Sequence, residues 1–483
     1  MGGFTRRRLL LGTGAGLGAL GALTVLRSPA SSSLRFPVPN DTDVGSAPFT
    51  LKRDAISEFS GGVGTLTLRL KNSFRGSLML PQGRYDEIRI IGDAGSRPAI
   101  YGSSLFTSGW TKTAGLVSVY ERTVLRFGRD GFVPSQSGIV EVTASVNHPV
   151  GRAGSGQTIP VRPYIRQSPN RWAKNLAQAL ITLDHSPMSF MAELPSKKLY
   201  VHCRNSLNPN TLSLEYAECN FCLGFVGAGP TDIRPMRIIV ENIDLKYSYG
   251  DCLKLEKARI DLFNVRASGS VIGNGIGADD CSGVIAGCST IGNNNDGVNS
   301  SSANGATESR TPAVLEIIDH FSKGQIVGDG LSNHKGVTFN VKGGRFIANG
   351  KDGFVPAEAD GSVDGALFQD NVSQGVHAYG TNAKPVIVDV RNCLIEGNGV
   401  GIAVTASNTV PISAGPTKIA RVNSRSNHFR NNVTASLRAS APDGYAGFAM
   451  IESIDDRTSG AAPLEGHNAA RSGTITTVAS API

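Results

Sequence analysis

Apolar and polar residues alternate with a period of two in several short segments of the chain. The clearest are MRIIVENIDLKY (236–247), GVTFNVKGGRF (336–346) and PVIVDVRNCLIEG (385–397), which are rich in Val, Ile and Phe. A period of two puts successive side chains on opposite faces of a strand, whereas a helix requires a period of about 3.6 residues. The pattern therefore predicts short β-strands, not helices, in these segments.

The predicted strands recur together with a turn that contains Asn or Asp and then Gly, about every 22 to 26 residues from Ile239 to about Ser436. One glycine marks each copy: Gly250, Gly275, Gly297, Gly330, Gly353, Gly375 and Gly401. The step from Gly297 to Gly330 is about ten residues longer than the others, and the excess falls on residues 301–312. A repeat of this length indicates a solenoid with a loop inserted in one coil.

A coil of about 22 residues has room for three strands of roughly 3 to 5 residues each, with neighbouring coils about 4.8 Å apart. We therefore predict an all-β fold, a right-handed parallel β-helix of short three-strand coils with an N-terminal cap and loop insertions. The competing solenoid is a leucine-rich horseshoe, but the sequence lacks its Leu-x-x-Leu-x-Leu frame. The composition agrees, because 58 of 483 residues are Gly and only 18% are charged.

The extent of the repeat predicts how the chain is organised. One β-helix body is expected over residues 76–440, after a segment over 31–75 that caps the open end of the solenoid. Residues 441–483 are expected to form a partly disordered extension, because the repeat fades there and the residues become small and polar. No Pro- or Ser-rich linker divides the body, so the period favours a single unit.

Residues 1–30 differ from the rest of the chain. TRRRLLL (5–11) is followed by a Gly- and Ala-rich apolar run and by SPA (28–30), and no acidic residue precedes Asp41. This arrangement resembles a twin-arginine export signal, with removal expected after Ala30. It predicts a periplasmic or secreted protein without a stable membrane span after removal. A retained anchor is the alternative, because about 18 apolar residues nearly span a bilayer.

Charge gives little information about partners. The segment 1–30 contains four arginines, which is half of the formal surplus of eight positive charges. The sequence contains no Lys- or Arg-rich run with interleaved aromatic residues, so we expect no nucleic-acid partner. The net positive charge of the remaining residues is compatible with an acidic polysaccharide but does not require one. We expect a monomer that acts on a polysaccharide.

Export would make disulfides chemically accessible to the seven cysteines, Cys203, Cys219, Cys222, Cys252, Cys281, Cys288 and Cys393. Cys219 and Cys222 have CxxC spacing, but no second pair of zinc ligands follows them. A redox motif would need a strand-to-helix context that this segment lacks. We predict buried cysteines stacked in the coils, or one disulfide, in preference to a metal site or catalysis.

Two stretches carry a resemblance to a known superfamily. Residues 76–110 are similar to the opening coils of the pectate-lyase-like superfamily of carbohydrate-active parallel β-helix proteins. The matching residues are Pro81, Tyr85, Arg97, Pro98, Ile100, Gly102, Gly109 and Trp110. Residues 190–211 resemble the segment before the regular coils, through Leu199, Tyr200, Val201, Asn208 and Pro209. The resemblance spans about 76–436 and implies a polysaccharide substrate without specifying a reaction, since adhesive β-helices share the fold.

Three consecutive copies of the repeat place an acid directly before the marker glycine: Asp296, Asp329 and Asp352. Equivalent positions stack in a β-helix, so neighbouring acids should lie about 5 Å apart and the outer two about 10 Å apart. Unpaired carboxylates at that distance repel, which raises at least one pKa or requires a cation. The acids are predicted to bind Ca²⁺ or to serve as general acid and base. The alternative is a structural turn, because Asn and Asp tolerate left-handed backbone angles.

The middle copy departs from the pattern. Three other copies carry Asn four residues before the glycine: Asn293, Asn349 and Asn371. Ile326 stands at that position in the middle copy, and DGLSNHKG (329–336) follows with a carboxylate, a hydroxyl, an imidazole and an ammonium group. His334 is predicted to act as acid or base near neutral pH. The alternative interpretation is that His334 is an ordinary surface histidine in a turn, without a role in catalysis.

Further charged residues lie on neighbouring copies. Lys351 is a candidate lyase base beside Asp352, since a lysine with a locally lowered pKa can remove a proton next to a uronate carboxylate. Four residues are predicted to bind substrate: His320, Lys335, Glu358 and His377. Asp279 and Asp280 resemble the paired aspartates of polygalacturonase-type hydrolases, but the Asn-x-Asp motif of that family does not precede them, so its mechanism is not transferred.

Three functions follow from these residues. The leading hypothesis is a lyase in which the three stacked acids hold Ca²⁺ and Lys351 or His334 removes the C5 proton of a uronate, so that β-elimination breaks the chain. The second is a glycoside hydrolase that uses two of the acids. The third is a non-catalytic glycan-binding or cell-surface solenoid. The sugar and the linkage are not specified by the sequence.

Overall fold

The computed structural model describes residues 56–62, 64–81, 85–124, 138–141, 146–147, 158–159, 162–163, 165–166, 176–193, 196–226, 236–301, 313–380, 386–406, 419–441, 448–459 and 473–478. The expected export signal over 1–30, residues 31–55 of the expected cap and residues 302–312 of the expected insertion lie outside this part of the chain. No helix within the described residues is long and apolar enough to cross a membrane.

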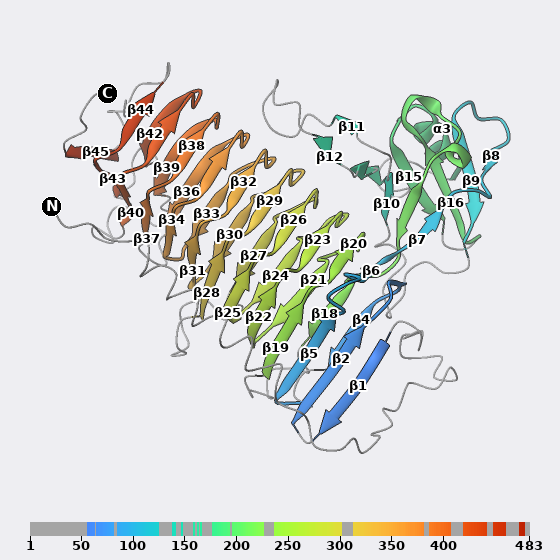
Figure 1. Cartoon of the computed structure of the whole chain (residues 1–483). Helices are drawn as coiled ribbons and strands as arrows, with labels where there is room; N and C mark the ends of the chain where they lie inside the picture. Colours follow the sequence, from blue (N-terminus) through green and yellow to red (C-terminus); the bar gives the residue numbers. More distant parts are fainter. Residues whose placement is uncertain are drawn as a thin grey trace, which may run out of the picture.

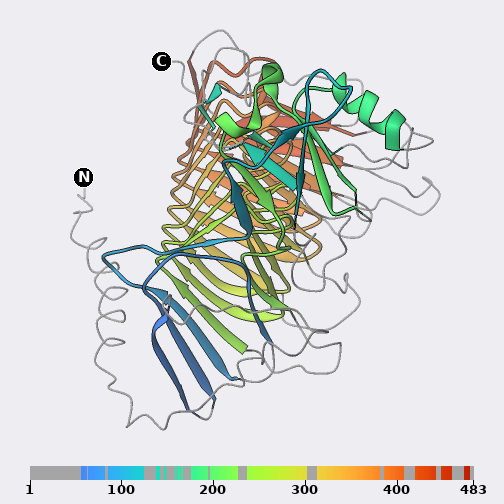
Figure 2. The same ribbon diagram turned by 90° about the vertical axis from the view of Figure 1, so that its right-hand side faces the viewer.

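Three parallel sheets form the body of the protein, and the chain passes from sheet A to sheet B to sheet C in each coil (Figure 1). In the described residues sheet A has 13 strands, sheet B has 11 and sheet C has 10. The coils stack along one axis, from the blue strands at one end to the orange strands at the other (Figure 2). The predicted fold, an all-β parallel β-helix of three-strand coils, is confirmed.

The strands have the following bounds. Sheet A contains β1 (Ile56–Gly62), β2 (Thr65–Leu70), β5 (Glu87–Gly92), β19 (Met236–Glu241), β22 (Ala258–Phe263), β25 (Ser282–Ala286), β28 (Ala313–Ile318), β31 (Val337–Lys342), β34 (Gly361–Asp364), β37 (Val386–Arg391), β40 (Ile419–Arg425), β43 (Phe448–Ile454) and β45 (Gly473–Val478). Sheet B contains β3 (Phe74–Arg75), β6 (Ala99–Tyr101), β20 (Asp244–Lys246), β23 (Arg266–Ser268), β26 (Ser289–Ile291), β29 (Phe321–Lys323), β32 (Arg345–Ile347), β35 (Leu367–Gln369), β38 (Leu394–Glu396), β41 (His428–Arg430) and β44 (Arg457–Ser459). Sheet C contains β4 (Leu78–Pro81), β18 (Leu223–Val226), β21 (Leu253–Glu256), β24 (Ile276–Asp279), β27 (Val298–Ser301), β30 (Leu331–His334), β33 (Phe354–Ala357), β36 (Gln374–Gly380), β39 (Val400–Ala406) and β42 (Ala435–Ser440).

The interior of the coils is a continuous aliphatic and aromatic core. On β2, for example, Leu66, Leu68 and Leu70 point inward and are buried, while the residues between them are partly exposed. The period-two pattern of the sequence therefore places one face of each strand inside the solenoid, as strand geometry requires. All seven cysteines are buried.

The turn between sheets A and B needs a single residue with a left-handed backbone. Asn242, Asn264, Asp319 and Asn392 occupy this corner in four of the coils with φ between 49° and 57°, and Gly343 occupies it in another. Asn, Asp and Gly adopt this conformation at the lowest cost, which explains why they recur there. The recurring corner keeps successive coils in register without a longer connection.

A second unit interrupts the first coils between β6 and β18. It contains β7 (Ser103–Phe106), β8 (Thr111–Lys112), β9 (Val119–Thr123), β10 (Gly138–Glu141), β11 (Val146–Asn147), β12 (Thr158–Ile159), β13 (Arg162–Pro163), β14 (Ile165–Arg166), α3 (Leu176–Asp184), β15 (Ser189–Glu193), β16 (Lys198–His202), two short 3₁₀ turns (Arg204–Ser206 and Pro209–Thr211) and β17 (Leu214–Ala217). Almost all of its strand pairs are antiparallel, and it lies beside the coils in both views (Figures 1 and 2).

This inserted unit has its own core, which includes Phe106, Trp110, Phe190 and Tyr216. The sequence was expected to form one body because no linker of biased composition flanks the insertion. The chain instead leaves the coils directly after β6 and returns directly before β18, so no linker is needed. The segment 190–211, which we compared with residues that precede regular coils, belongs to this antiparallel unit.

The parallel sheets also include strands outside the expected range 76–440. β2 and β3 lie before residue 76, and β43, β44 and β45 continue sheets A and B beyond residue 440. β1 pairs antiparallel with β2 at the first edge of sheet A, through Ile56 to Gly62. An antiparallel strand at this edge occupies hydrogen-bonding groups that a further coil would otherwise use.

Candidate functional site

The three predicted acids stack on successive coils in the turn between sheets B and C, hereafter the B–C turn. Oδ1 of Asp296 accepts the backbone N–H of Asp329 at 2.8 Å, and Oδ1 of Asp329 accepts that of Asp352 at 2.9 Å. Oδ1 of Asp352 accepts the N–H of Gln374 at 2.8 Å. Each carboxylate therefore bridges to the following coil, and we call this column the acid ladder.

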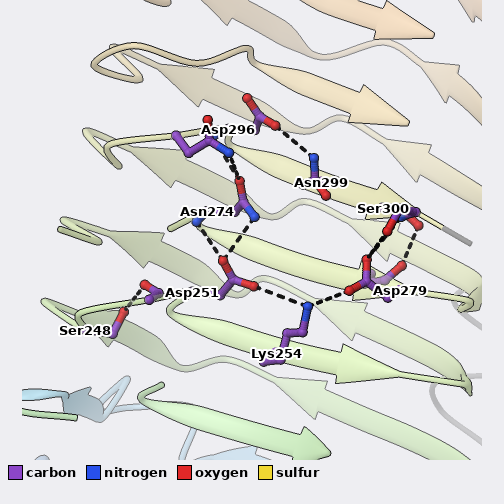
Figure 3. Close-up of polar contacts among 12 residues, drawn as sticks. Ser248, Asp251, Lys254, Asn274, Asp279, Asp296, Asn299 and Ser300 are labelled. Atoms are coloured by element: carbon purple, nitrogen blue, oxygen red, sulfur yellow. Dashed lines mark hydrogen bonds and ion pairs between the residues drawn. The ribbon is translucent and has the colours of Figure 1, made fainter. Parts of the chain in front are cut away.

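The acid ladder starts two coils earlier than the sequence indicated. Asp251 accepts the N–H of Asn274 at 2.8 Å, and the side-chain oxygen of Asn274 accepts the N–H of Asp296 at 3.0 Å (Figure 3). Leu253 pairs with Ile276, so Cys252 is the residue equivalent to Gly275. The glycine chosen as the first marker, Gly250, is thus two residues out of register, and this error hid Asp251.

The marker glycines are required by close packing between coils. A Cβ atom on Gly297 would lie 2.4 Å from the carbonyl oxygen of Gly330, and one on Gly353 would lie 2.5 Å from that of Gly375. None of Asp296, Asp329 and Asp352 is among the described residues with a left-handed backbone. The acids therefore occupy the turn because they accept hydrogen bonds from the next coil.

A second column of side chains lies inside the same turn and consists of amides: Asn293, Gln325, Asn349, Asn371, Asn398 and Asn432. The N–H of Asn293 donates to Oε1 of Gln325 at 3.0 Å, and Gln325 donates in turn to Asn349. The amide that the sequence seemed to lose at Ile326 is therefore supplied by Gln325, whose extra methylene compensates for a position one residue earlier. The amide ladder is unbroken through the site.

The second carboxylate oxygen of each acid forms a hydrogen bond or an ion pair with a side chain on the outer surface. Oδ2 of Asp296 accepts from Nδ2 of Asn299 at 2.9 Å, and Oδ2 of Asp329 lies 3.3 Å from Nζ of Lys351. Oδ2 of Asp352 lies 3.2 Å from Nδ1 of His377. The acids are buried, whereas the side chain of Lys351 is 52% exposed. The outer oxygens thus lie just beneath the surface of sheet C.

Burial and mutual repulsion raise the pKa values of the acids in the middle of the ladder. Burial, followed by the charges of Asp296 and Asp352, raises the pKa of Asp329 to about 7. Burial also raises the pKa of Asp296, although the N–H of Asp329 and the amide of Asn299 act against it. Near neutral pH the pair formed by Asp296 and Asp329 therefore holds a proton that it can transfer.

Two basic residues face the acids, and their pKa values shift in opposite directions. Burial alone would lower the pKa of Lys351, but the charges of Asp329 and Asp352 and the hydrogen bond to Asp329 raise it. Lys351 thus stays charged, which disagrees with the lowered pKa expected of a lyase base. Burial lowers the pKa of His334 despite the charge of Asp296. His334 is neutral at pH 7, and its Nε2 lies 2.6 Å from Oγ of Ser332.

His320 does not lie at this surface. Its ring is buried between the sheets, with Nε2 3.1 Å from Oγ1 of Thr290 and the ring 6.3 Å from that of Phe346. Within the described residues its Nδ1 has no hydrogen-bond partner, and burial lowers its pKa to about 3. The expectation that His320 binds substrate is therefore incorrect, because Asp319 takes the corner and turns the next residue into the core.

The other residues predicted to bind substrate surround sheet C. His377 lies on the outer face of β36, next to Asp352. Lys335 and Glu358 lie at the opposite end of the strands of sheet C. Lys335 follows β30 and Glu358 follows β33, and each has a left-handed backbone. Both contribute to the electrostatic surroundings of His334. The structure thus places the acids, Lys351 and His377 at one end of the strands of sheet C and Lys335 and Glu358 at the other, whereas His320 lies in the core.

Lys254, Asp251 and Asp279 form a charged cluster on the coils that precede the acids. The sequence did not predict this cluster as part of the site. Nζ of Lys254 lies 2.5 Å from Oδ2 of Asp279 and 3.7 Å from Oδ2 of Asp251 (Figure 3). Burial raises the pKa of Asp251. Gly277 leaves room for this cluster, since a Cβ atom there would lie 2.2 Å from Oδ2 of Asp251. Correct alignment of the earlier coils would have revealed the cluster.

The predicted Ca²⁺ site finds no matching arrangement of ligands. In the part of the chain that the structure describes, no group of three or more His, Cys, Asp or Glu side chains is arranged to hold a metal ion. Oδ1 of each ladder acid is used by a backbone N–H, and each Oδ2 faces a different partner. The ladder therefore offers one outward oxygen per coil, whereas Ca²⁺ takes about six to eight oxygen ligands.

The sequence matches no family model and no curated protein. Solved structures that are similar to it include the following two. One, described as "Glycoside hydrolase", is 10% identical with a TM-score of 0.41 and covers 87% of this chain and 89% of its own. The other, described as "The complex structure of XylC with xylose", is 10% identical with a TM-score of 0.35 and covers 81% of this chain and 64% of its own. At such low identities and scores, neither likeness bears on the activity of this protein.

Proposed function

We propose that this protein is a polysaccharide-degrading enzyme, and specifically a glycoside hydrolase that acts at the outer face of sheet C. Asp329 is assigned as the general acid and Asp296 as the nucleophile or base. The observation that supports this most directly is the stacked pair itself, in which the pKa of Asp329 is raised to about 7 by burial and by its two acidic neighbours. A carboxyl that keeps its proton near neutral pH can protonate a glycosidic oxygen.

The spacing of the pair suits this chemistry. Neighbouring coils of a parallel β-helix are about 4.8 Å apart, so the carboxyl groups of Asp296 and Asp329 belong to coils separated by about that distance. Retaining glycosidases hold their two carboxyl groups about 5 to 5.5 Å apart. We therefore infer that the product keeps its anomeric configuration. Lys351, which covers Oδ2 of Asp329 and is half exposed, is the side chain that substrate would displace.

The charge of the face favours a neutral glycan. Asp251, Asp279, Asp296, Asp329 and Asp352 line the part of the face around the proposed catalytic pair, and Lys254 and Lys351 are paired with these acids. A polyuronate would be repelled wherever these acids are ionised. The substrate class that follows is a neutral polysaccharide or oligosaccharide.

Lyase chemistry is the second candidate, and one observation favours it. His334 is half-buried and neutral at pH 7, because burial lowers its pKa, and it lies on the same face as the acids. A neutral imidazole is competent to remove the C5 proton of a uronate. In this alternative His334 replaces Lys351 as the base, since Lys351 remains charged.

One experiment separates the two reactions. The purified chain is incubated with a panel of neutral and uronate-containing polysaccharides, and both new reducing ends and the ultraviolet absorbance of unsaturated uronides are followed. Hydrolysis yields reducing ends without absorbance, and Asp329→Asn abolishes it. Asp389→Asn, on the exposed face of β37, is the matched control and keeps wild-type turnover. Absorbance that depends on His334 would replace the hydrolase with the lyase, and glycan binding without turnover would refute both.

The same assay addresses calcium. We propose hydrolysis without a resident metal, because each ladder acid has one outward oxygen. Turnover is therefore expected to be equal with and without a chelator. Loss of activity with EDTA and its return with Ca²⁺ would support the metal-assisted scheme that the sequence suggested.

A further inference from the structure

A second chain of polar side chains runs from the B–C turn before β33 to β36 and β39 on the outer face of sheet C. Nδ1 of His377 lies 3.2 Å from Oδ2 of Asp352, and its Nε2 lies 3.0 Å from Oγ1 of Thr405. Because a carboxylate only accepts, Nδ1 carries the ring proton and Nε2 accepts from the Thr405 hydroxyl. This is the order of an acid that orients a base and a base that activates a hydroxyl.

The burial of the three groups follows the same order. The side chain of Asp352 is 0% exposed, that of His377 is 19% exposed, and Thr405 is half-buried on the surface of β39. Oδ1 of Asp352 also accepts the N–H of Gln374, so the carboxylate is held from two sides. The fixed acid lies underneath while the hydroxyl faces outward, as a nucleophile that meets substrate requires.

Strand register explains why these side chains meet. His377 pairs with Ala403, and Tyr379 pairs with Thr405, so His377 and Thr405 are diagonal neighbours on adjacent strands. Such diagonal neighbours lie within reach of long side chains. Ala403 pairs with His377 on one side and with Arg438 on the other, and its small side chain is buried between the two strands that carry them.

The next strand contributes a positive charge. Arg438 pairs with Ala403 in register, and the burial pattern of β42 places it on the outer face. Oγ of Ser440 lies 3.4 Å from Oγ1 of Thr405 on the same strand face. A guanidinium and a hydroxyl beside the nucleophile can stabilise negative charge that develops on a carbonyl oxygen.

We propose that Asp352, His377 and Thr405 form an acyl-transfer site that hydrolyses esters, such as O-acyl groups carried by a polysaccharide. Oγ1 of Thr405 bonds to the ester carbonyl carbon while its proton passes to Nε2 of His377. The carbon–oxygen bond to the sugar then breaks, and the sugar oxygen takes that proton from Nε2. Water, deprotonated by His377, attacks the acyl-threonine, which releases the carboxylic acid and restores the Thr405 hydroxyl.

This activity is distinct from the proposed glycan cleavage, since it needs neither Asp296 nor Asp329, although Asp352 also raises the pKa of Asp329. The test uses the purified full chain and p-nitrophenyl acetate, with p-nitrophenol release as the readout. Thr405→Ala and His377→Asn should each lower the rate by about 100-fold or more, while Thr405→Ser retains it. Thr338→Ala, on β31 of sheet A, is the matched control and should hydrolyse the ester at the wild-type rate.

A second measurement guards against misfolded variants. The wild-type chain is treated with a fluorophosphonate and digested, and the labelled peptide is sequenced by mass spectrometry. Labelling of Thr405 that His377→Asn prevents is the expected result. The proposal is overturned if wild-type protein cleaves the ester no faster than buffer, if Thr405→Ala cleaves it as fast as wild type, or if the label is found on another residue.

Discussion

The buried imidazole of His320 predicts a specific loss of stability in mild acid. Burial lowers its pKa from 6.5 to about 3, so the folded protein keeps it neutral while the unfolded chain takes up a proton below pH 6.5. Stability from this residue is therefore fully present above pH 6.5 and declines as the pH falls towards 3. The perturbation that isolates the effect is His320→Phe, which removes the titration and keeps a ring beside Phe346.

The magnitude follows from the size of the shift. Each pKa unit corresponds to about 1.4 kcal/mol, so one unit below the unfolded value, at pH 5.5, the wild type should have lost about 1.4 kcal/mol on account of His320. Near pH 3 the loss of stability on account of His320 reaches its limit of about 5 kcal/mol. Acids with raised pKa values, such as Asp329, act in the opposite direction, but both proteins contain them and their contribution cancels in the difference.

Urea unfolding at pH 7.5, 6.5 and 5.5, followed by circular dichroism, measures this difference. The free energy of unfolding of wild type minus that of His320→Phe should fall by about 1.4 kcal/mol between the upper and lower pH values. His428→Phe, at a partly exposed position on β41, is the control and should show no such change. A difference that does not vary with pH would refute the assignment of His320 as a neutral, buried group.

Three further predictions concern the proposed catalytic acid, the stability of the coils and export. Lys351→Met removes a charge that lowers the pKa of Asp329, so the alkaline limb of the pH–rate profile should move to higher pH; a limb that does not move would separate Asp329 from catalysis. Gln325→Ala breaks the amide ladder and should lower the free energy of unfolding by about 1 to 3 kcal/mol in urea titrations, whereas Ile326→Ala should cost less. Replacement of the arginines at 6 and 7 by lysine should abolish export in cell fractionation if the segment 1–30 acts as a twin-arginine signal.

The sequence contained enough information for the coil and too little for its exact register. Alternation of apolar and polar residues identified the strands, and the recurring glycines identified the repeat, because both are imposed by local geometry. Cys252 replaced the glycine in one coil, so a residue-type marker chose Gly250 instead. Strand pairing places Asp251 in line with the later acids, and the hydrogen bond from the N–H of Asp296 shows that Asn274 belongs to the same ladder.

Besides the register of the coils, the burial of individual side chains could not be predicted from the sequence. Asp319 and His320 are adjacent, yet the left-handed corner at Asp319 sends the following ring into the core. Gln325 fills the place of an Asn from a position one residue away, so the apparent loss of an amide at Ile326 was not a loss of structure. The inserted unit escaped notice for a related reason, since it joins the coils without a linker of distinctive composition.

The two ladders in the B–C turn run in opposite directions. In the amide ladder each backbone N–H donates to the side chain of the following coil, as Asn371 does to Asn398, whereas in the acid ladder Asp352 donates to Asp329 of the preceding coil. A cut between two coils therefore leaves an N–H without its acceptor on each side. A truncated solenoid should therefore contain both ladders in full. Such a truncated version should begin before Asp251 and end beyond Asn432.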